Sequence, residues 1–120
     1  MFKKRKREIE EKLEKKRPLH SCRGANFFGI KSAGSRQVRG NGMLALLESE
    51  LFFEMWRPKR ELHVPLKAIE QVEIVKSFLR KTKSQPLLKI SFVNHEGDPD
   101  EAAWLVRDPE AWIELITKHK

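Results

Sequence analysis

The sequence predicts a mainly β domain with one helix at its C-terminal end. Short apolar runs are separated by turn residues through the middle of the chain, apolar and polar residues alternate over 88–92, and an amphipathic pattern covers 108–119. About seven short strands fit this spacing, and strands with one polar face form an antiparallel sandwich or barrel whose open end a helix can close. With 120 residues the chain is long enough for one such core.

The first predicted element is a basic helix over 3–17. No Gly or Pro interrupts this run, and Pro18 ends it because proline has no amide N–H to donate to a continuing helix. The apolar side of the helix is narrow and holds only Phe2, Ile9 and Leu13. We therefore expect residues 1–18 to form a basic arm that projects into solvent or rests lightly on a domain formed by residues 19–120.

Strands follow from Asn26 onwards. The first is expected over 26–32, where a glycine-containing stretch ends it. Apolar runs at 43–48 and 51–56 are separated by two residues, which is a hairpin spacing. The fourth strand is expected over 61–64, and its alternation places His63 on the outer face of the sheet.

The second half of the sheet is predicted in the same way. Pro65 ends the fourth strand, and 66–69 has the composition of a single helical turn. Strands are expected over 71–76 and 86–94, the latter with its apolar residues directed inward. The acidic stretch 95–100 is a turn by composition.

The last strand is predicted over 102–106, and the terminal helix follows it. Asp108 is a suitable N-cap, and Pro109 suits the first helical position. Trp112 and Ile116 are spaced to lie on one face of this helix, so the helix must cover an apolar surface.

The net charge of +8 is concentrated in the first half of the chain. Residues 1–60 carry 16 basic and 7 acidic side chains, whereas residues 61–120 carry 9 and 10. A basic region attracts nucleic acid, anionic lipid or acidic protein, because its long-range field does not distinguish among them. The candidate polyanion-binding residues of the arm are Lys3, Lys4, Arg5, Lys6 and Arg7.

Several classes of protein are not supported by the sequence. No apolar stretch approaches the roughly 18–20 residues of a membrane span, and no signal peptide is predicted. Cys22 is the single cysteine, so no internal disulfide can form, which suits a reducing, cytoplasmic compartment. The four histidines and Cys22 lack the spacing of a zinc site. No nucleophile elbow, glycine-rich phosphate loop or paired carboxylates are present, so we expect no enzymatic activity, no metal and no cofactor.

Short segments of the predicted strands and terminal helix carry a further signal. They are Gly42-Met43-Leu44-Ala45-Leu46, Glu50-Leu51-Phe52-Phe53, Val64-Pro65-Leu66-Lys67-Ala68-Ile69-Glu70-Gln71-Val72, Leu88-Lys89-Ile90-Ser91-Phe92 and Ala111-Trp112. These segments resemble the pleckstrin-homology-like superfamily, in particular its GRAM-type and bacterial stand-alone members, and the likeness runs from about residue 26 to residue 117. The resemblance implies a bent antiparallel seven-stranded barrel capped by the helix that contains Trp112, and a non-catalytic binding role.

The resemblance also implies candidate ligand-binding residues. Lipid binders of this family use basic side chains on the loops after the first, third and sixth strands. In this chain the loop after the first strand supplies Lys31, Arg36 and Arg39. The loop after the third strand supplies Arg57, Lys59 and Arg60, next to the aromatic residue Trp56. The loop after the sixth strand instead contains Glu96, Asp98, Asp100 and Glu101, whose charges oppose a phosphate.

We expect the function to be binding of a protein partner, through an exposed sheet edge or a groove beside the terminal helix. Two alternatives stay open. The basic loops could bind an anionic lipid surface, which would place the protein at the periphery of a membrane. The arm could bind nucleic acid through phosphates without reading its sequence. The partner could also be a second copy, as in a homo-oligomer.

Overall fold

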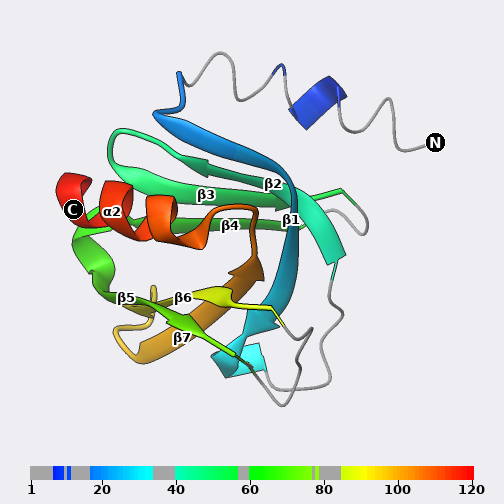
Figure 1. Cartoon of the computed structure of the whole chain (residues 1–120). Coiled ribbons are helices and arrows are strands. Elements are labelled where there is room, and N and C mark those ends of the chain that lie inside the picture. Colours follow the sequence, from blue (N-terminus) through cyan, green and yellow to red (C-terminus); the bar gives the residue numbers. More distant parts are fainter. Residues whose placement is uncertain are drawn as a thin grey trace.

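A computed structural model confirms a mainly β domain with a C-terminal helix. It describes residues 7–9, 11, 17–33, 40–56, 60–76, 78 and 85–120. The described strands form one antiparallel sheet in the order β4-β3-β2-β1-β7-β6-β5 (Figure 1). They are β1 (His20–Ile30), β2 (Gly40–Leu46), β3 (Glu50–Met55), β4 (Arg60–Pro65), β5 (Ile69–Val75), β6 (Leu87–Val93) and β7 (Pro99–Leu105). The helix is α2 (Pro109–His119), and two short turns are η1 (Lys31–Ala33) and η2 (Leu66–Ala68).

Strand β1 joins the two halves of the sheet. It pairs with β2 over residues 20–27 and with β7 over residues 26–30, and each ladder contains a register shift. Gly24 and Gly29 lie beside these shifts with φ of 80° and 124°, values that residues with a Cβ rarely adopt. The two bulges let the strand curve from one half to the other, as Figure 1 shows. β1 begins six residues earlier than the predicted 26–32 because pairing with β2 stabilises its polar first half.

The inner face of the curved sheet and α2 enclose the main core. Phe27, Phe53 and Trp104 form its centre, with ring centroids 5.1 to 5.8 Å apart. Trp112 and Ile116 of α2 are buried in the same core, as the helix periodicity predicts. Burial of side chains of this size stabilises a fold by about 1.5–3 kcal/mol each.

A second apolar cluster lies on the outer face of β2 and β3. We call it the outer cluster; its buried members are Ile9, Met43, Ala45, Leu47 and Phe52. Ile9 is 0% exposed and belongs to a described helical part of the arm, Arg7 to Ile9. Of the two expectations for the arm, this part therefore rests on the domain and does not project into solvent. It does so because β2 and β3 carry apolar side chains on both faces, and Ile9 covers part of the outer ones.

The end of the chain departs from the predicted boundaries in one respect. β7 begins at Pro99, so Pro99 and Asp100 are strand residues although the sequence places them in the turn over 95–100. The single helical turn predicted after Pro65 is confirmed as η2. Asp108 occupies the N-cap of α2, although its side chain makes no capping hydrogen bond. None of the described helices is long and apolar enough to cross a membrane.

Candidate binding site

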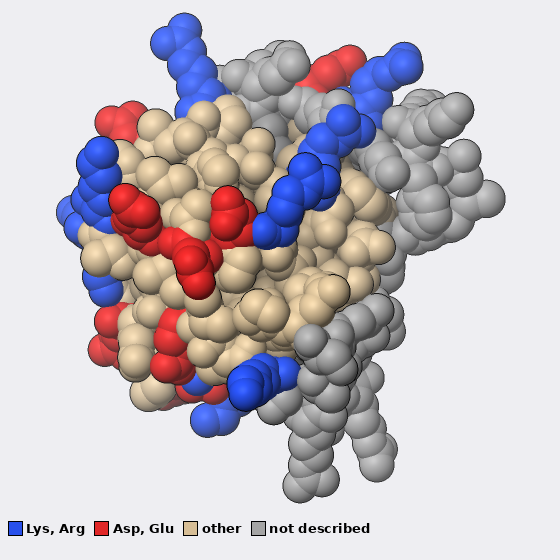
Figure 2. Space-filling model, viewed as in Figure 1, with Lys and Arg blue, Asp and Glu red and all other residues tan. Residues whose placement is uncertain are grey.

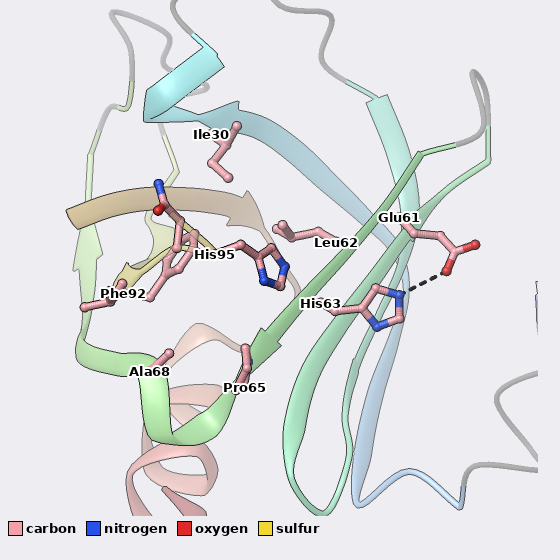
Figure 3. A pocket seen from close by; sticks show the side chains of 10 residues that line it. Ile30, Glu61, Leu62, His63, Pro65, Ala68, Phe92 and His95 are labelled. Carbon is pink, nitrogen blue, oxygen red and sulfur yellow. Dashed lines mark hydrogen bonds and ion pairs between the residues drawn. The ribbon is translucent and has the colours of Figure 1, made fainter. Parts of the chain in front are cut away.

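A cleft of about 460 Å³ lies between the edge strand β4 and the end of β6. Figure 3 shows its lining from four parts of the chain: β4 on one side, η2 below, the end of β6 with the following turn on the other side, and Ile30 at the end of β1. Its lining is mostly apolar and includes Leu62, Pro65, Ala68 and Phe92, together with His63 and His95. A cleft of this size and character falls within the usual range of ligand sites.

The cleft exists because the sheet does not close into a complete barrel. β4 and β5 stand at opposite ends of the strand order, although only the short turn η2 separates them in the chain. The chain therefore crosses between the two free edges without pairing them. The seam that remains beside β4 is the cleft.

The backbone of β4 directs hydrogen-bonding groups toward this seam. Leu66 donates its N–H to the Ser49 carbonyl oxygen at 3.0 Å, so Ser49 and Leu66 form a hydrogen-bonded pair next to the β3–β4 ladder. Hydrogen-bonded and non-hydrogen-bonded pairs alternate along an antiparallel ladder, so this pair determines the type of every other pair between the two strands. His63 pairs with Phe52 at a non-hydrogen-bonded position of this ladder. The N–H and C=O of His63 consequently point away from β3, toward the open edge. Pro65, at the next outward position, has no N–H, so the usable edge is short.

The side chain of His63 is fixed on the outer side of the cleft, as its predicted outer-face position requires. Its Nδ1 lies 2.7 Å from Glu50 Oε2, and its Nε2 lies 3.1 Å from Glu61 Oε1. The Phe52 ring packs against the imidazole, with the two ring centroids 4.8 Å apart. Glu50 and Glu61 thus place two carboxylates around one imidazole at this rim.

The opposite rim is the turn between β6 and β7. The Asn94 side-chain oxygen accepts the N–H groups of Glu96 and Asp98 at 3.0 and 3.1 Å, which holds the turn. Gly97 supplies the positive φ of 85° that the turn requires. His95 is exposed on this turn and its side chain extends toward the cleft (Figure 3). Both walls of the cleft are therefore ordered by local hydrogen bonds.

The other free edge of the sheet, β5, is partly covered. Lys120 donates from Nζ to the carbonyl oxygens of Ile69 and Glu70, at 3.3 and 3.1 Å. These bonds tie the end of α2 to the start of β5. Of the two edges, β4 is the one whose outward-facing backbone borders the cleft.

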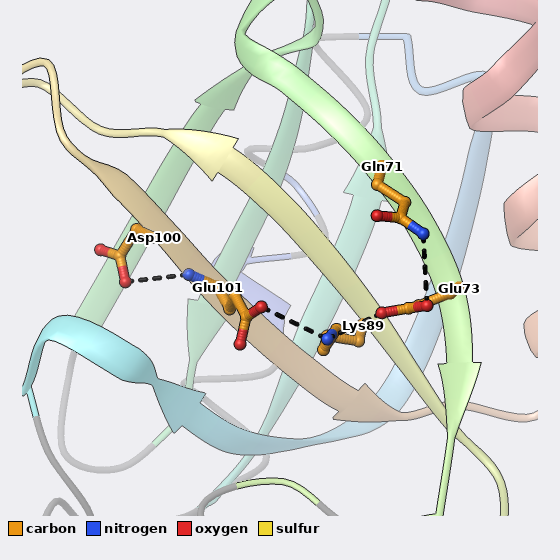
Figure 4. Close-up of polar contacts among 5 residues, drawn as sticks. All are labelled: Gln71, Glu73, Lys89, Asp100 and Glu101. Carbon is orange, nitrogen blue, oxygen red and sulfur yellow. Dashed lines mark hydrogen bonds and ion pairs between the residues drawn. The ribbon is translucent and has the colours of Figure 1, made fainter.

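The outer surface of β5, β6 and β7 carries a row of ion pairs (Figure 4). Lys89 Nζ lies 2.7 Å from Glu73 Oε1 and 3.3 Å from Glu101 Oε2. The hydrogen bond to Glu73, with a further contribution from Glu101, raises the pKa of Lys89 above its ordinary value, although burial opposes this. On the face seen in Figure 2, the described acidic and basic residues are interspersed. This arrangement suits a solvated structural surface more than a polyanion site.

The structure separates the ligand-binding residues expected from the sequence. Lys31 is exposed in η1, and Arg7 is exposed on the arm. Arg60 points to the inner side, with its guanidinium carbon 5.5 Å from the Phe27 ring centroid. Trp56 packs against the outer cluster on the other face of the sheet. The remaining candidates, which are Lys3, Lys4, Arg5, Lys6, Arg36, Arg39, Arg57 and Lys59, lie outside the described residues.

The sequence does not predict the cleft. Alternation directs Phe92 toward the core and places His63 on the outer face of the sheet, and neither pattern indicates a gap between the strands. The one local indication of the cleft is the short connection η2 between the two edge strands β4 and β5. Within the described residues, no three or more His, Cys, Asp and Glu side chains are grouped so that they could hold a metal ion.

Comparison with known proteins provides the fold alone. No family model matches the chain, and no curated protein matches it. A chain of the 8S snRNP assembly intermediate is similar with a TM-score of 0.64 at 11% sequence identity, covering 84% of this chain and 80% of that chain. The C-terminal domain of an unknown protein from Leishmania infantum is similar with a TM-score of 0.57 at 18% identity, covering 93% of this chain and 92% of that chain.

Proposed function

We propose that this chain is a pleckstrin-homology-like, GRAM-type binding module without catalytic activity, and that it binds an extended segment of a protein partner at the edge of β4. The strand order, the curved sheet and the helix with Trp112 agree with the expected architecture. The observation that carries the proposal is the apolar cleft beside the outward-facing backbone of His63.

The geometry suits strand addition. A partner segment in extended conformation would pair its backbone with the N–H and C=O of His63, which the β3–β4 register directs to the open edge. Every second side chain of that segment would then face the cleft, because side chains alternate along a strand. Leu62, Ala68 and Phe92 offer an apolar surface to one such side chain. The short edge limits backbone pairing, so the apolar side chain supplies most of the affinity.

The charge of the rim indicates what should flank that apolar side chain. Glu50 and Glu61 both face His63, and both side chains are partly exposed, at 28% and 31%. A lysine or arginine of the partner would complement these carboxylates. The partner segment we propose is therefore extended, with an apolar anchor next to a basic residue.

The lipid and nucleic-acid alternatives receive less support from the described residues. Arg60 is directed to the Phe27 ring, and Trp56 is packed in the outer cluster, so neither is presented with Lys31 at one surface. The acidic residues of the β6–β7 turn, Glu96 and Asp98, are exposed beside the cleft. Both features disfavour a phosphate at this end of the domain.

A peptide-display experiment tests the proposal. Random peptides of about twelve residues on phage are selected against the whole chain, and the enriched peptides are synthesised and titrated by calorimetry. We expect enriched sequences that pair an apolar with a basic residue, and at least tenfold weaker binding to Leu62→Glu, because a charge would be buried against the anchor. The matched control is Leu19→Glu, which places the same substitution at an exposed leucine that does not line the cleft.

Two further measurements separate the alternatives. Vesicles containing about 30% phosphatidylserine, and random duplex or single-stranded DNA, are tested for binding at low and physiological salt. One result would replace the proposal with the lipid function. In that case no peptide is enriched, the unmodified chain binds the vesicles, and the double variant Arg57→Glu with Lys59→Glu does not bind them. A second result would replace the proposal with nucleic-acid binding. In that case no peptide is enriched, the unmodified chain slows the migration of DNA in a gel, and the chain without residues 1–17 does not.

A further inference from the structure

A second cleft of about 460 Å³ lies on another part of the sheet, between the start of β1 and the start of α2. Residues 20–23 of β1 form one wall, and Arg107, Asp108 and Trp112 form the other. None of these residues lines the cleft beside β4. The two clefts are therefore separate surfaces of the domain.

This second cleft exists because β7 does not extend along the first half of β1. The pairing of β7 with β1 ends at Leu105, which lies opposite Asn26. The chain then bends at Arg107 and enters α2 at Pro109. Residues 20–25 of β1 consequently have β2 on one side and no described strand on the other.

The backbone of Ser21 faces this open side. Leu47 donates its N–H to the Glu50 carbonyl oxygen at 2.8 Å, and the β2–β3 register contains no shift, so the odd-numbered residues of β2 bond to β3. The even-numbered residues bond to β1, and one of them is Leu44, the partner of Cys22. Ser21 is the neighbour of Cys22, so its N–H and C=O point away from β2 and toward the cleft.

The charged side chains that line the cleft are mainly basic. Arg23 and Arg107 are both exposed and come from opposite walls. Asp108 is the acidic residue of the described lining, and it occupies the N-cap of α2, where the positive end of the helix dipole offsets part of its charge. His20 packs against Trp112 in a T-shaped arrangement with ring centroids 4.5 Å apart, which connects the two walls. The cleft thus presents two guanidinium groups beside an outward-facing peptide group.

We propose that an extended, acidic segment of a protein partner binds in this cleft as an added strand beside the first half of β1. The backbone of the segment pairs with the N–H and C=O of Ser21. Its Asp or Glu side chains lie next to Arg23 and Arg107, because a guanidinium group donates two parallel hydrogen bonds to a carboxylate. A peptide suits this surface better than a small anion, since the Ser21 carbonyl oxygen repels an anion and accepts a peptide N–H.

This surface selects the opposite charge from the surface at β4. Glu50 and Glu61 beside His63 suit a basic residue, whereas the two arginines here suit an acidic one. The second surface shares no lining residue with the first and does not depend on it.

A peptide library with an acidic residue at every second position tests the proposal. Peptides of about ten residues on phage are selected against the whole chain, and the enriched peptides are synthesised and titrated by calorimetry. We expect enriched peptides whose affinity falls at least about tenfold in Arg107→Glu. The matched control is Lys67→Glu, which makes the same change of charge at an exposed lysine that lines neither cleft and should leave the affinity unaltered.

A substitution at Ser21 tests the backbone pairing. Ser21→Pro removes the N–H that faces the cleft and removes no hydrogen bond to β2. It should weaken binding about tenfold, and circular dichroism establishes that the variant is folded. If Ser21→Pro does not fold, amide hydrogen exchange in the unmodified chain decides, because a bound peptide should slow the exchange of the Ser21 amide at least about tenfold.

Leu62→Glu, which blocks the cleft beside β4, separates this proposal from the proposed function. Binding that is weakened by Arg107→Glu and unaltered by Leu62→Glu supports the second surface, whatever the result at β4. Enriched peptides that bind Arg107→Glu as well as the unmodified chain overturn the proposal, and so does a library in which no peptide is enriched. Self-association of the chain that Arg107→Glu abolishes, without any enriched peptide, also overturns it and assigns the surface to a second copy.

Discussion

The carboxylate of Asp100 accepts the backbone N–H of Ser32 at 2.9 Å, and this bond joins the start of β7 to the turn that follows β1. Asp100 is 3% exposed, and the same oxygen accepts the N–H of Glu101 at 2.9 Å. Strand β1 supplies one lining residue of the cleft, Ile30, immediately before that turn. The contact therefore holds two segments next to the cleft in a fixed relation.

Replacement of Asp100 by alanine should lower the free energy of unfolding by about 1–3 kcal/mol. The N–H groups of Ser32 and Glu101 would lose the buried carboxylate that both of them share as an acceptor. Urea denaturation monitored by tryptophan fluorescence measures this change. Asp98→Ala is the control, because Asp98 is exposed on the neighbouring turn. Equal stability of the two variants would show that the bond to Ser32 contributes little.

Gly42 should not tolerate a Cβ. A methyl group at this position would collide with the Glu54 carbonyl oxygen and lie 2.8 Å from the Met55 Cα, both on the backbone of β3. We expect Gly42→Ala to lower the free energy of unfolding by more than about 2 kcal/mol, since backbone atoms cannot move away as a side chain can. Gly97→Ala is the comparison: it meets no atom within 4 Å, and only its φ of 85° is unfavourable, at a cost of about 1–2 kcal/mol.

The ion pairs of Lys89 should contribute stability at neutral pH and lose it in strong alkali. The folded-state pKa of Lys89 lies above 10.5, chiefly through the hydrogen bond to Glu73. The contribution is therefore fully present below the unfolded-state pKa and is lost as the pH rises through the folded-state value. Lys89→Met should be less stable than the unmodified chain at pH 8 by up to about 1 kcal/mol, and this difference should shrink as the pH rises through the folded-state pKa. The control is Lys67→Met, which replaces an exposed lysine of η2. If the loss of stability caused by Lys89→Met is the same at every pH, the ion pairs are not its cause.

The acidic rim of the cleft should make peptide binding sensitive to salt and to Glu50. Peptides selected against the chain should bind several-fold more weakly to Glu50→Gln, since one of the two carboxylates around His63 loses its charge. An increase from about 50 to 500 mM salt should weaken binding to the unmodified chain more than to the variant. Calorimetric titration measures both effects. If Glu50→Gln leaves the peptide affinity unchanged, the partner segment does not need a basic residue next to its apolar anchor.

The elements that the sequence predicts well are those with local determinants. The alternation over 88–92 and the spacing of Trp112 and Ile116 mark β6 and α2 because each pattern follows from one buried face. The first half of β1 and the start of β7 were not predicted. Their residues are polar or turn-forming, and they are strands because neighbouring strands pair with them.

The candidate site could be predicted only in fragments. The outer-face position of His63 follows from alternation, but the cleft beside it depends on strand order, which local patterns do not determine. Arg60 was expected at a loop surface with Trp56, whereas the two side chains lie on opposite faces of the sheet. The buried anchor at Ile9 was missed because its burial depends on the outer faces of β2 and β3.

The central claim is strand addition at β4, and amide hydrogen exchange at His63 tests it most directly. The N–H of His63 points to the open edge in the unbound chain, so it should exchange rapidly, and a peptide selected by display should slow its exchange at least tenfold by accepting that N–H. The amide of Val64, which already faces β3, should change little and is the internal reference. A bound peptide that leaves the exchange of His63 unaltered would contradict the account.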